Sequence, residues 1–423
     1  MHKMPPQRRY IPLLAFATFA LIFVLYRSSS ARETWRTLPQ HVGMGESIPD
    51  DSDDAQPPEL VQDYSSANST QSPKSLTSHA KPNFQPGTAY PPGHEYTRIL
   101  VIPRTHDEDI SWISEELPEW RTAIYTVDDP LSPLHPPKNK GHEVMVYLSW
   151  IIDSYDALPD VAAFMHAHRW SWHNDDILDN DAAQMLRRLS SERVMREGYM
   201  NMRCHWDPGC PDWMHPGEVE EDINKQEQTM VAKAWSEIFP LDPIPDVLAQ
   251  ACCAQFALSK ERIRSIPLAS FVWYRDWLLK TQLSDYISGR IWEYMWQYIF
   301  TGQNVVCPAM HQCYCDGFGV CFGGEPEFND WFELRYRMRR HEDELREWHE
   351  KEKAILDAKA DGKLDEAAKL EVPESGRDRW LQEQIDHLRL DLEERKQKAF
   401  KKGEDPRLRA EECGREWKEG DGF

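Results

Sequence analysis

The chain has 423 residues, of which 40% are hydrophobic and 28% are charged, and its formal net charge at pH 7 is −22. This length and this apolar content are enough for one large or two ordinary folded domains, so the composition excludes a chain that is disordered throughout. The acidic balance leaves no basic surface that could wrap nucleic acid, and we therefore expect no nucleic-acid partner.

An uninterrupted apolar run occupies residues 11–26, with arginines on both sides. At roughly 1.5 Å per residue, the run is at the short end of the range for a helix that spans a bilayer. We predict a cytosolic tail at residues 1–10 and a transmembrane signal anchor over residues 11–26. The chain is therefore expected to bind a membrane through this single-pass anchor. The alternative is a cleaved signal peptide with Ser29 and Ala31 near the cut. The charge of Arg27, which lies between the run and that cut, favours the anchor.

Cysteines indicate which side of the membrane holds the folded domain. Eight of the nine lie between Cys204 and Cys321, an even number in one block. This pattern is typical of disulfides formed in an oxidising lumen. A zinc site is the alternative, but the spacings lack the C-x-x-C pairs that such sites use. We expect the adjacent Cys252 and Cys253 to pair with separate partners rather than with each other.

The segment that follows the anchor, residues 27–96, is rich in Ser, Pro, Asp and Gln and poor in large apolar residues. It cannot bury enough surface to offset its chain entropy, so we expect a disordered stem. The only N-glycosylation sequon of the chain begins at Asn68, within this stem, and it agrees with a lumenal glycoprotein. These features predict a single-pass type II protein of the Golgi or endoplasmic reticulum membrane.

A lumenal domain is predicted over residues 97–324, where β-favouring runs alternate with segments of helical periodicity. The expected strands cover residues 97–103, 122–128 and 161–165, and the expected helices cover residues 108–120 and 143–154. This alternation predicts an α/β fold with a mostly parallel sheet flanked by helices. Ligands of such sheets bind beyond the carboxyl ends of the strands.

The C-terminal extension, residues 325–423, is dominated by charged residues with intermittent Leu, Trp and Ala. Its pattern is interrupted around Pro373 and Gly376. It predicts two long charged helices that form a solvated hairpin, which serves solubility or contacts a protein partner.

The densest group of reactive side chains directly follows the strand expected at residues 161–165. His166 and His168 alternate in an extended segment and can therefore face one ion. Asp175 and Asp176 follow in the same loop, and these four residues are the predicted ligands of a divalent metal, manganese or magnesium. Arg169 and Asn174 lie between them and are predicted to bind a donor diphosphate. Loop capping and core hydrogen bonding are the alternative roles of such residues.

Two later segments complete the candidate site. Residues 251–263 predict a small-residue strand that runs into a helix capped by Ser259, and we assign Gln255 and Ser259 to donor binding. A central strand fixed by a disulfide is the alternative role. Residues 288–300 predict an aromatic helix that carries one carboxylate, Glu293, whose apolar surroundings suit a general base toward an acceptor hydroxyl. A pair with an arginine three residues earlier, or exposure to water, is the alternative for this carboxylate.

Several long sequence segments resemble those of the fungal family known as domain of unknown function 3431, over roughly Ile99 to Phe322. They are KNKGHEVMVYLSWIIDSYDALPD, FMHAHRWSWHND, GYMNMRCHWDPGCP, CCAQFALSKERI, SGRIWEYMWQYIF and the closing cysteine cluster. The resemblance implies no established activity. Gln297 stands where the family pattern places His after E-Y-x-W, so we do not count this position as an essential ligand.

The order of elements is also similar to that of GT-A glycosyltransferases, which have a Rossmann-like α/β fold. In this resemblance His166 and His168 stand where an Asp-x-Asp motif would be, and Glu293 activates the acceptor. It implies a nucleotide-sugar donor and a glycan acceptor. We therefore expect a glycosyltransferase-like enzyme. The alternatives are a non-catalytic carbohydrate-binding or scaffold protein of the secretory pathway and a histidine-metal hydrolase.

Overall fold

The computed structural model describes Pro82 and residues 84–423. The predicted cytosolic tail and anchor, and most of the predicted stem with its sequon at Asn68, lie outside these residues. Among the residues described, no helix is both long enough and apolar enough to cross a bilayer.

A five-stranded sheet forms the centre of the domain, in the order β2-β1-β3-β6-β4. Its strands are β1 (Arg98–Arg104), β2 (Arg121–Thr126), β3 (Val161–Phe164), β4 (Tyr199–Asn201) and β6 (Phe256–Ser259), and a separate pair is formed by β5 (Ala249–Gln250) and β7 (Val305–Val306). Strand β1 pairs in parallel with β2 and β3, whereas β6 is antiparallel to both β3 and β4. The predicted mostly parallel sheet is confirmed, with β6 as the exception.

The helices of the domain alternate with these strands and then follow them. They are α2 (Ser111–Glu116), α3 (Val144–Ser154), α4 (Ala182–Arg188), α5 (Ser191–Glu197), α6 (Gln228–Ile238), α7 (Lys260–Arg264), α8 (Leu268–Lys280), α9 (Asp285–Glu293), α10 (Trp296–Thr301) and α11 (Met310–Phe318). Helix α2 is shorter than predicted at both ends, and its early end follows from Pro118, which disfavours helical geometry at the preceding Leu117. The predicted aromatic helix is divided into α9 and α10 at Tyr294 and Met295.

Both faces of the sheet are buried, as the strand sequences require. In β1, Ile99 and Val101 belong to one hydrophobic cluster, whereas Leu100 and Ile102 belong to the other. This alternation is the two-residue period of a strand, and burial on both sides explains why the strands are almost wholly apolar. Helices α3, α6, α8, α9 and α10 cover the first face, and α4, α5 and α11 cover the second. The predicted flanking helices are therefore present on both faces.

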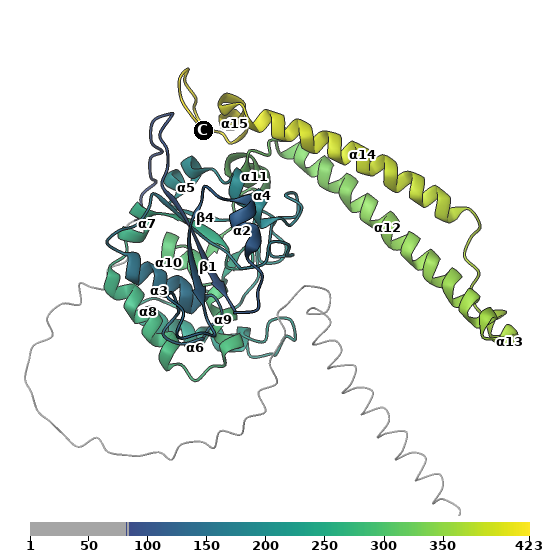
Figure 1. Ribbon diagram of the computed structural model, residues 1–423, viewed down its shortest axis with the longest axis horizontal. Coiled ribbons are helices and arrows are strands. Elements are labelled where there is room, and N and C mark those ends of the chain that lie inside the picture. Colours follow the sequence, from purple (N-terminus) through teal and green to yellow (C-terminus); the bar gives the residue numbers. More distant parts are fainter. Residues whose placement is uncertain (1–81, 83) are drawn as a thin grey trace, which may run out of the picture. The chain divides into compact units, whose positions relative to one another are not determined.

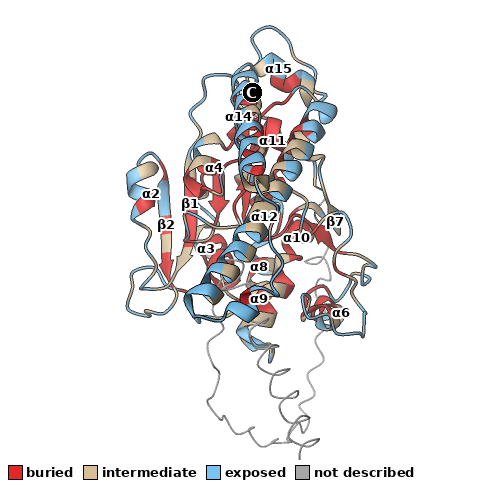
Figure 2. Ribbon diagram, turned by 90° about the vertical axis from the view of Figure 1, so that its right-hand side faces the viewer, coloured by how far each residue is buried: buried red, intermediate tan, exposed pale blue. Residues whose placement is uncertain are grey.

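The C-terminal extension forms the predicted helical hairpin. Its elements are α12 (Glu325–Ala360), α13 (Leu364–Ala367), α14 (Arg377–Gly403) and α15 (Pro406–Glu412). Helices α12 and α14 run side by side (Figure 1). Figure 2 shows that much of α12 is exposed, but Trp331 of α12 and Phe400 of α14 are buried in the second cluster of the domain. The base of the hairpin is thus part of the domain core.

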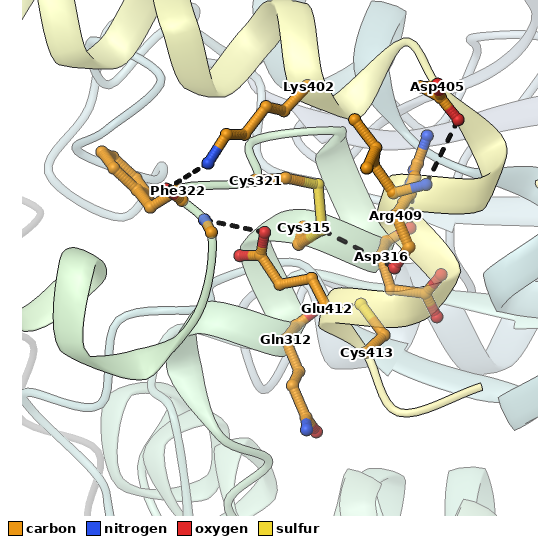
Figure 3. The surroundings of a disulfide bond; sticks show 12 residues. Gln312, Cys315, Asp316, Cys321, Phe322, Lys402, Asp405, Arg409, Glu412 and Cys413 are labelled. Carbon is orange, nitrogen blue, oxygen red and sulfur yellow. Dashed lines mark hydrogen bonds between the residues drawn. A yellow bond between two sulfur atoms is a disulfide. The ribbon is translucent and has the colours of Figure 1, made fainter.

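Eight cysteines form four disulfides, as the even block predicted. The pairs are Cys204–Cys313, Cys210–Cys307, Cys252–Cys253 and Cys315–Cys321. The expectation that Cys252 and Cys253 have separate partners is wrong, because they are bonded to each other. Figure 3 shows the Cys315–Cys321 bond beside α15, where Glu412 accepts a hydrogen bond of 2.8 Å from the backbone N–H of Gly323.

The folded part of the chain begins before residue 97. Phe84 packs against the first cluster, and the guanidinium of Arg262 lies 4.6 Å from its ring centroid. Tyr90 packs against the second cluster. Aromatic side chains at the end of the predicted stem therefore bury surface that its average composition does not reveal.

Candidate functional site at the carboxyl edge of the sheet

The carboxyl ends of β1, β2 and β3 lie at one edge of the sheet, because these three strands are parallel. Strand β6 runs in the opposite direction, so its first residue, Phe256, pairs with Phe164 at the end of β3. Asn201 at the end of β4 also pairs with Phe256. The loop that begins at Met165 and the residues that precede β6 therefore meet at this edge, where the sequence predicted a site.

A buried amide pair joins these two segments. The side-chain oxygen Oε1 of Gln255 accepts a hydrogen bond of 3.1 Å from the backbone N–H of His166, and its Nε2 donates to Oδ1 of Asn174 at 3.1 Å. Asn174 Nδ2 in turn donates to the carbonyl oxygens of Arg169 and Asn180, at 2.8 and 2.9 Å. Gln255 and Asn174 are only 1% and 0% exposed. This network fixes the backbone on both sides of the segment from His166 to His168, which we call the histidine motif.

Each histidine of the motif faces a carboxylate. His166 Nε2 lies 4.0 Å from Oε2 of Glu143, the residue that precedes α3, and both side chains are largely buried. His168 Nε2 lies 3.4 Å from Oε1 of Glu108, and about half of its side chain is exposed. The other oxygen of Glu108 accepts hydrogen bonds from the backbone and hydroxyl of Thr105. These are electrostatic contacts, and a carboxylate beside an imidazole is a feature of sites that use histidine as a general base or acid.

The two aspartates of the predicted metal set are engaged elsewhere. Asp175 is fully buried and accepts hydrogen bonds from the backbone N–H groups of Cys204 and Ile177, at 2.9 and 3.2 Å. Burial raises the pKa of Asp175 to about 7, and the neighbouring Asp176 carboxylate adds to the rise. Burial alone would also raise the pKa of Asp176, but its ion pair with Arg335 of α12 holds that pKa below the ordinary value.

The four predicted metal ligands do not form a ligand group. Within residues 84–423, one group of three or more candidate ligand atoms is close enough to share an ion, and it consists of Cys315, Cys321 and Glu412. The two sulfurs of that group are bonded to each other as a disulfide, which removes the thiolates that would bind metal. The metal at the sheet edge therefore stays a prediction.

The predicted donor-binding residues are separated by the fold. Asn174 and Gln255 are brought together, as described above. Arg169 Nη1 binds Glu116 at 2.8 Å, and its Nε binds Asp181 at 3.1 Å. Ser259 pairs with Val161 at the start of β3 and so lies at the opposite edge of the sheet. Its hydroxyl caps α7, as predicted, by accepting a hydrogen bond of 3.2 Å from the N–H of the third residue of that helix.

Glu293 is the last residue of α9 and is partly exposed. Its backbone carbonyl accepts a hydrogen bond from Nε2 of Gln250, whose Oε1 accepts one of 2.7 Å from the hydroxyl of Tyr199 in β4. Arg290, one turn earlier, forms its close ion pair of 2.8 Å with the fully buried Glu227. The pair between Arg290 and Glu293 that was the alternative for this carboxylate is therefore not the main contact of the arginine. Gln297 is fully buried in α10.

The disulfide between Cys252 and Cys253 lies in the loop that leads into Gln255. Cys253 and Ala254 have positive φ angles of 91° and 46°, which are uncommon for residues with a side chain. The carbonyl of Ala251 accepts a hydrogen bond of 2.6 Å from Nδ2 of Asn201, and the backbone N–H of Cys252 donates one of 3.1 Å to the carbonyl of Pro208. The loop is therefore tightly positioned directly before the amide pair.

Sequence reasoning missed Glu143 and Glu108 as parts of the site. Glu108 lies in the loop after β1, where the rule for parallel strands could have indicated it. Glu143 had no local signal, because it precedes an ordinary apolar helix and reaches His166 only through the packing of α3 on the sheet.

Comparison with known proteins yields one match. The family model described as "Protein of unknown function (DUF3431)" matches residues 100–316, which are 217 of the 423 residues. No curated protein and no solved structure matches the chain. The matched region contains all five strands of the central sheet from Leu100 of β1 onward, together with both histidine–carboxylate pairs and the amide pair. The chain belongs to this family, the proteins of unknown function called DUF3431.

Proposed function

We propose that the domain is a glycosyltransferase-like enzyme of the secretory pathway, which transfers a sugar from a nucleotide donor to a glycan acceptor. In this proposal the chain is a single-pass type II protein of the Golgi or endoplasmic reticulum membrane. The observation that supports it best is that two side-chain pairs lie at the carboxyl edge of a mostly parallel sheet. They are the histidine–carboxylate pair His166–Glu143 and the amide pair Gln255–Asn174.

The two pairs suggest different roles. His166 accepts the proton of the acceptor hydroxyl, and the Glu143 carboxylate, 4.0 Å away, stabilises the charged form of the imidazole. Gln255 and Asn174 position the backbone of the histidine motif. Glu293, the base predicted from the sequence, remains the second candidate for proton transfer. The variant Glu293→Ala tests it, because sugar transfer that stays fully intact in this variant would remove the assignment.

A nucleotide diphosphate would approach the carboxylates of Glu108 and Glu143 at this edge. The negative charges of the diphosphate and of these carboxylates repel each other, so the proposal requires a cation to accompany the donor. Manganese or magnesium would supply that charge neutralisation when bound, and His168 is the predicted ligand that the proposed proton transfer by His166 leaves available. We therefore expect donor binding to depend on the divalent ion.

A non-catalytic carbohydrate-binding protein is the second candidate, and one observation favours it. The guanidinium of Arg169 and the carboxylates of Asp175 and Asp176 already have protein partners. Residues whose hydrogen bonds and charges are satisfied within the fold have less capacity to bind a donor nucleotide. This candidate predicts sugar binding without nucleotide binding.

Thermal unfolding of the full chain in lipid nanodiscs separates the two candidates. A nucleotide sugar that binds only the folded protein stabilises it by about 2.7 kcal/mol at one hundred times its dissociation constant. We expect one member of a panel of nucleotide sugars with manganese to raise the melting temperature. The variant His168→Ala, which removes the predicted metal ligand, should lose the rise, whereas His215→Ala, a half-exposed histidine outside the candidate site, should keep it. A folded protein that responds to no nucleotide would contradict the transferase proposal.

A further inference from the structure

A cleft of about 830 Å³ lies between α6, α8 and the residues that follow α8. This volume is within the range of sites that hold small organic ligands. Its apolar lining includes Met230 of α6 and the two tryptophans Trp273 and Trp277 of α8. No residue of the candidate site described above lines this cleft.

Trp273 presents a fixed aromatic surface. Its indole N–H donates a hydrogen bond of 2.9 Å to the carbonyl of Ile238, so the one polar atom of the ring is satisfied, yet 45% of the residue is exposed. The same residue also lines a second cleft of about 360 Å³, together with Tyr274 and Tyr298. Trp277 is held similarly, through a hydrogen bond of 2.8 Å to Glu237. Aromatic surface that is fixed before binding costs little conformational entropy when a ligand stacks on it.

The charged residues around the cleft cancel each other. Lys233 lies 4.0 Å from Glu237, and Lys280 lies 3.4 Å from Asp276, each pair separated by one helical turn. The four side chains line the cleft with no net charge. Such a rim offers donors and acceptors for hydroxyl groups but no attraction for a phosphate or an anionic lipid. Fixed indole surface with a neutral polar rim fits a neutral sugar chain, whose C–H faces stack on aromatic rings and whose hydroxyls bind the rim.

One end of the cleft is connected to the candidate site. The carbonyl of Leu283, which lines the cleft, accepts a hydrogen bond from Nζ of Lys140. Two residues further along each segment, the backbone N–H of His142 donates to Asp285 at 3.1 Å. Glu143, the next residue, faces His166. A ligand that leaves the cleft past Leu283 therefore approaches the segment that ends in Glu143, one member of the proposed pair.

We propose that the cleft between α6 and α8 binds a neutral oligosaccharide, with Trp273 as its stacking platform, and that this oligosaccharide is the acceptor of the reaction. The second half of this statement rests on the proposed function, whereas the binding of the sugar chain does not. The two parts fail separately, because sugar-chain binding is measured without a nucleotide.

The experiment measures binding of mannotetraose, cellotetraose and galactotetraose to the full chain by calorimetry. The protein is kept in lipid nanodiscs, because glucoside and maltoside detergents would compete for a sugar site. We expect one of the three to bind and Trp273→Ala to weaken that binding at least about tenfold. Met230→Arg, which fills the cleft with a long charged side chain and leaves Trp273 in place, should weaken it similarly. Trp380→Ala removes a tryptophan of similar exposure, 42%, from α14 and should have no effect.

Three results would overturn the proposal. They are no binding of any neutral tetrasaccharide, binding that is unchanged by both cleft variants, and equal weakening by Trp380→Ala. Binding that depends on Trp273, in a protein that no nucleotide sugar stabilises, would keep the sugar site but remove the acceptor role. It would then favour the non-catalytic carbohydrate-binding protein.

Discussion

Replacing Asp160 by asparagine should destabilise the domain in a way that depends on pH. Asp160 precedes β3 and is 7% exposed. Its carboxylate accepts hydrogen bonds from Lys260 Nζ at 2.7 Å, and from the backbone N–H and the hydroxyl of Thr97 at 2.9 and 2.7 Å. These contacts join the starts of β1 and β3 to the end of β6. Asparagine can keep only the contacts of one oxygen, because its amide N–H₂ would face the donors of the other.

The size of the effect follows from the pKa. Burial alone would raise the pKa of Asp160, but the hydrogen bonds from Lys260 and Thr97 outweigh burial and lower it from 3.8 to about 2. One pKa unit corresponds to about 1.36 kcal/mol, so the ionised carboxyl stabilises the folded state by about 2 kcal/mol. Because the folded-state pKa is the lower one, this contribution is present above pH 3.8. It is lost as the pH falls from 3.8 through 2.

Urea unfolding followed by circular dichroism, with the disulfides intact, measures this contribution. At neutral pH we expect Asp160→Asn to lower the free energy of unfolding by about 2 kcal/mol, and the difference from the native protein to shrink as the pH approaches 2. Asp156→Asn is the matched control, because that side chain is 95% exposed and should change the free energy by less than about 0.5 kcal/mol. A loss that is equally large in strong acid would refute the assignment to the ionised carboxyl.

Three further changes test the loops at the sheet edge. Gln255→Ala leaves the backbone N–H of His166 without its acceptor, so urea unfolding should show a loss of about 3 kcal/mol, and an unchanged midpoint would contradict the network. Arg335→Met leaves the largely buried Asp176 without its main counter-charge and should cost about 3 kcal/mol by the same assay, whereas a stabilised variant would show that the pair is unfavourable. Cys253→Ser should expose one additional thiol to alkylation in denaturant, on Cys252. Labelling of any other disulfide cysteine would contradict the adjacent pairing.

Local signals account for the parts of the fold that were predicted well. The apolar runs at β1, β2 and β3 are bounded by polar loops, and the face of α3 repeats with the helical period, so each could be located without knowledge of its partners. The hydroxyl of Ser259 caps α7 through atoms three residues apart. The rule that ligands bind at the carboxyl ends of parallel strands then placed the histidine motif at that edge of the sheet, where the structure has it. These predictions required only short-range patterns and one rule of topology.

Long-range pairing accounts for the parts that the sequence did not reveal. The direction of β6 decides that Gln255 meets His166 and that Ser259 lies at the far edge, and no local pattern encodes that direction. The contact of Glu143 with His166 depends on how α3 packs on the sheet, 23 residues from the histidine in sequence. The pairing of Cys252 with its neighbour depends on positive φ angles in a loop that resembled a strand in composition.

The C-terminal extension is coupled to the candidate site although the family match ends at residue 316. Arg335 of α12 pairs with Asp176, and Lys396 of α14 pairs with Asp179 at 2.7 Å. Both aspartates belong to the loop that begins with the histidine motif. Near the end of this loop, the carbonyl of Asn180 accepts a hydrogen bond from the side chain of Asn174. The charged helices, which the sequence assigned to solubility or partner contact, thus form two ion pairs with the loop that carries the histidine motif.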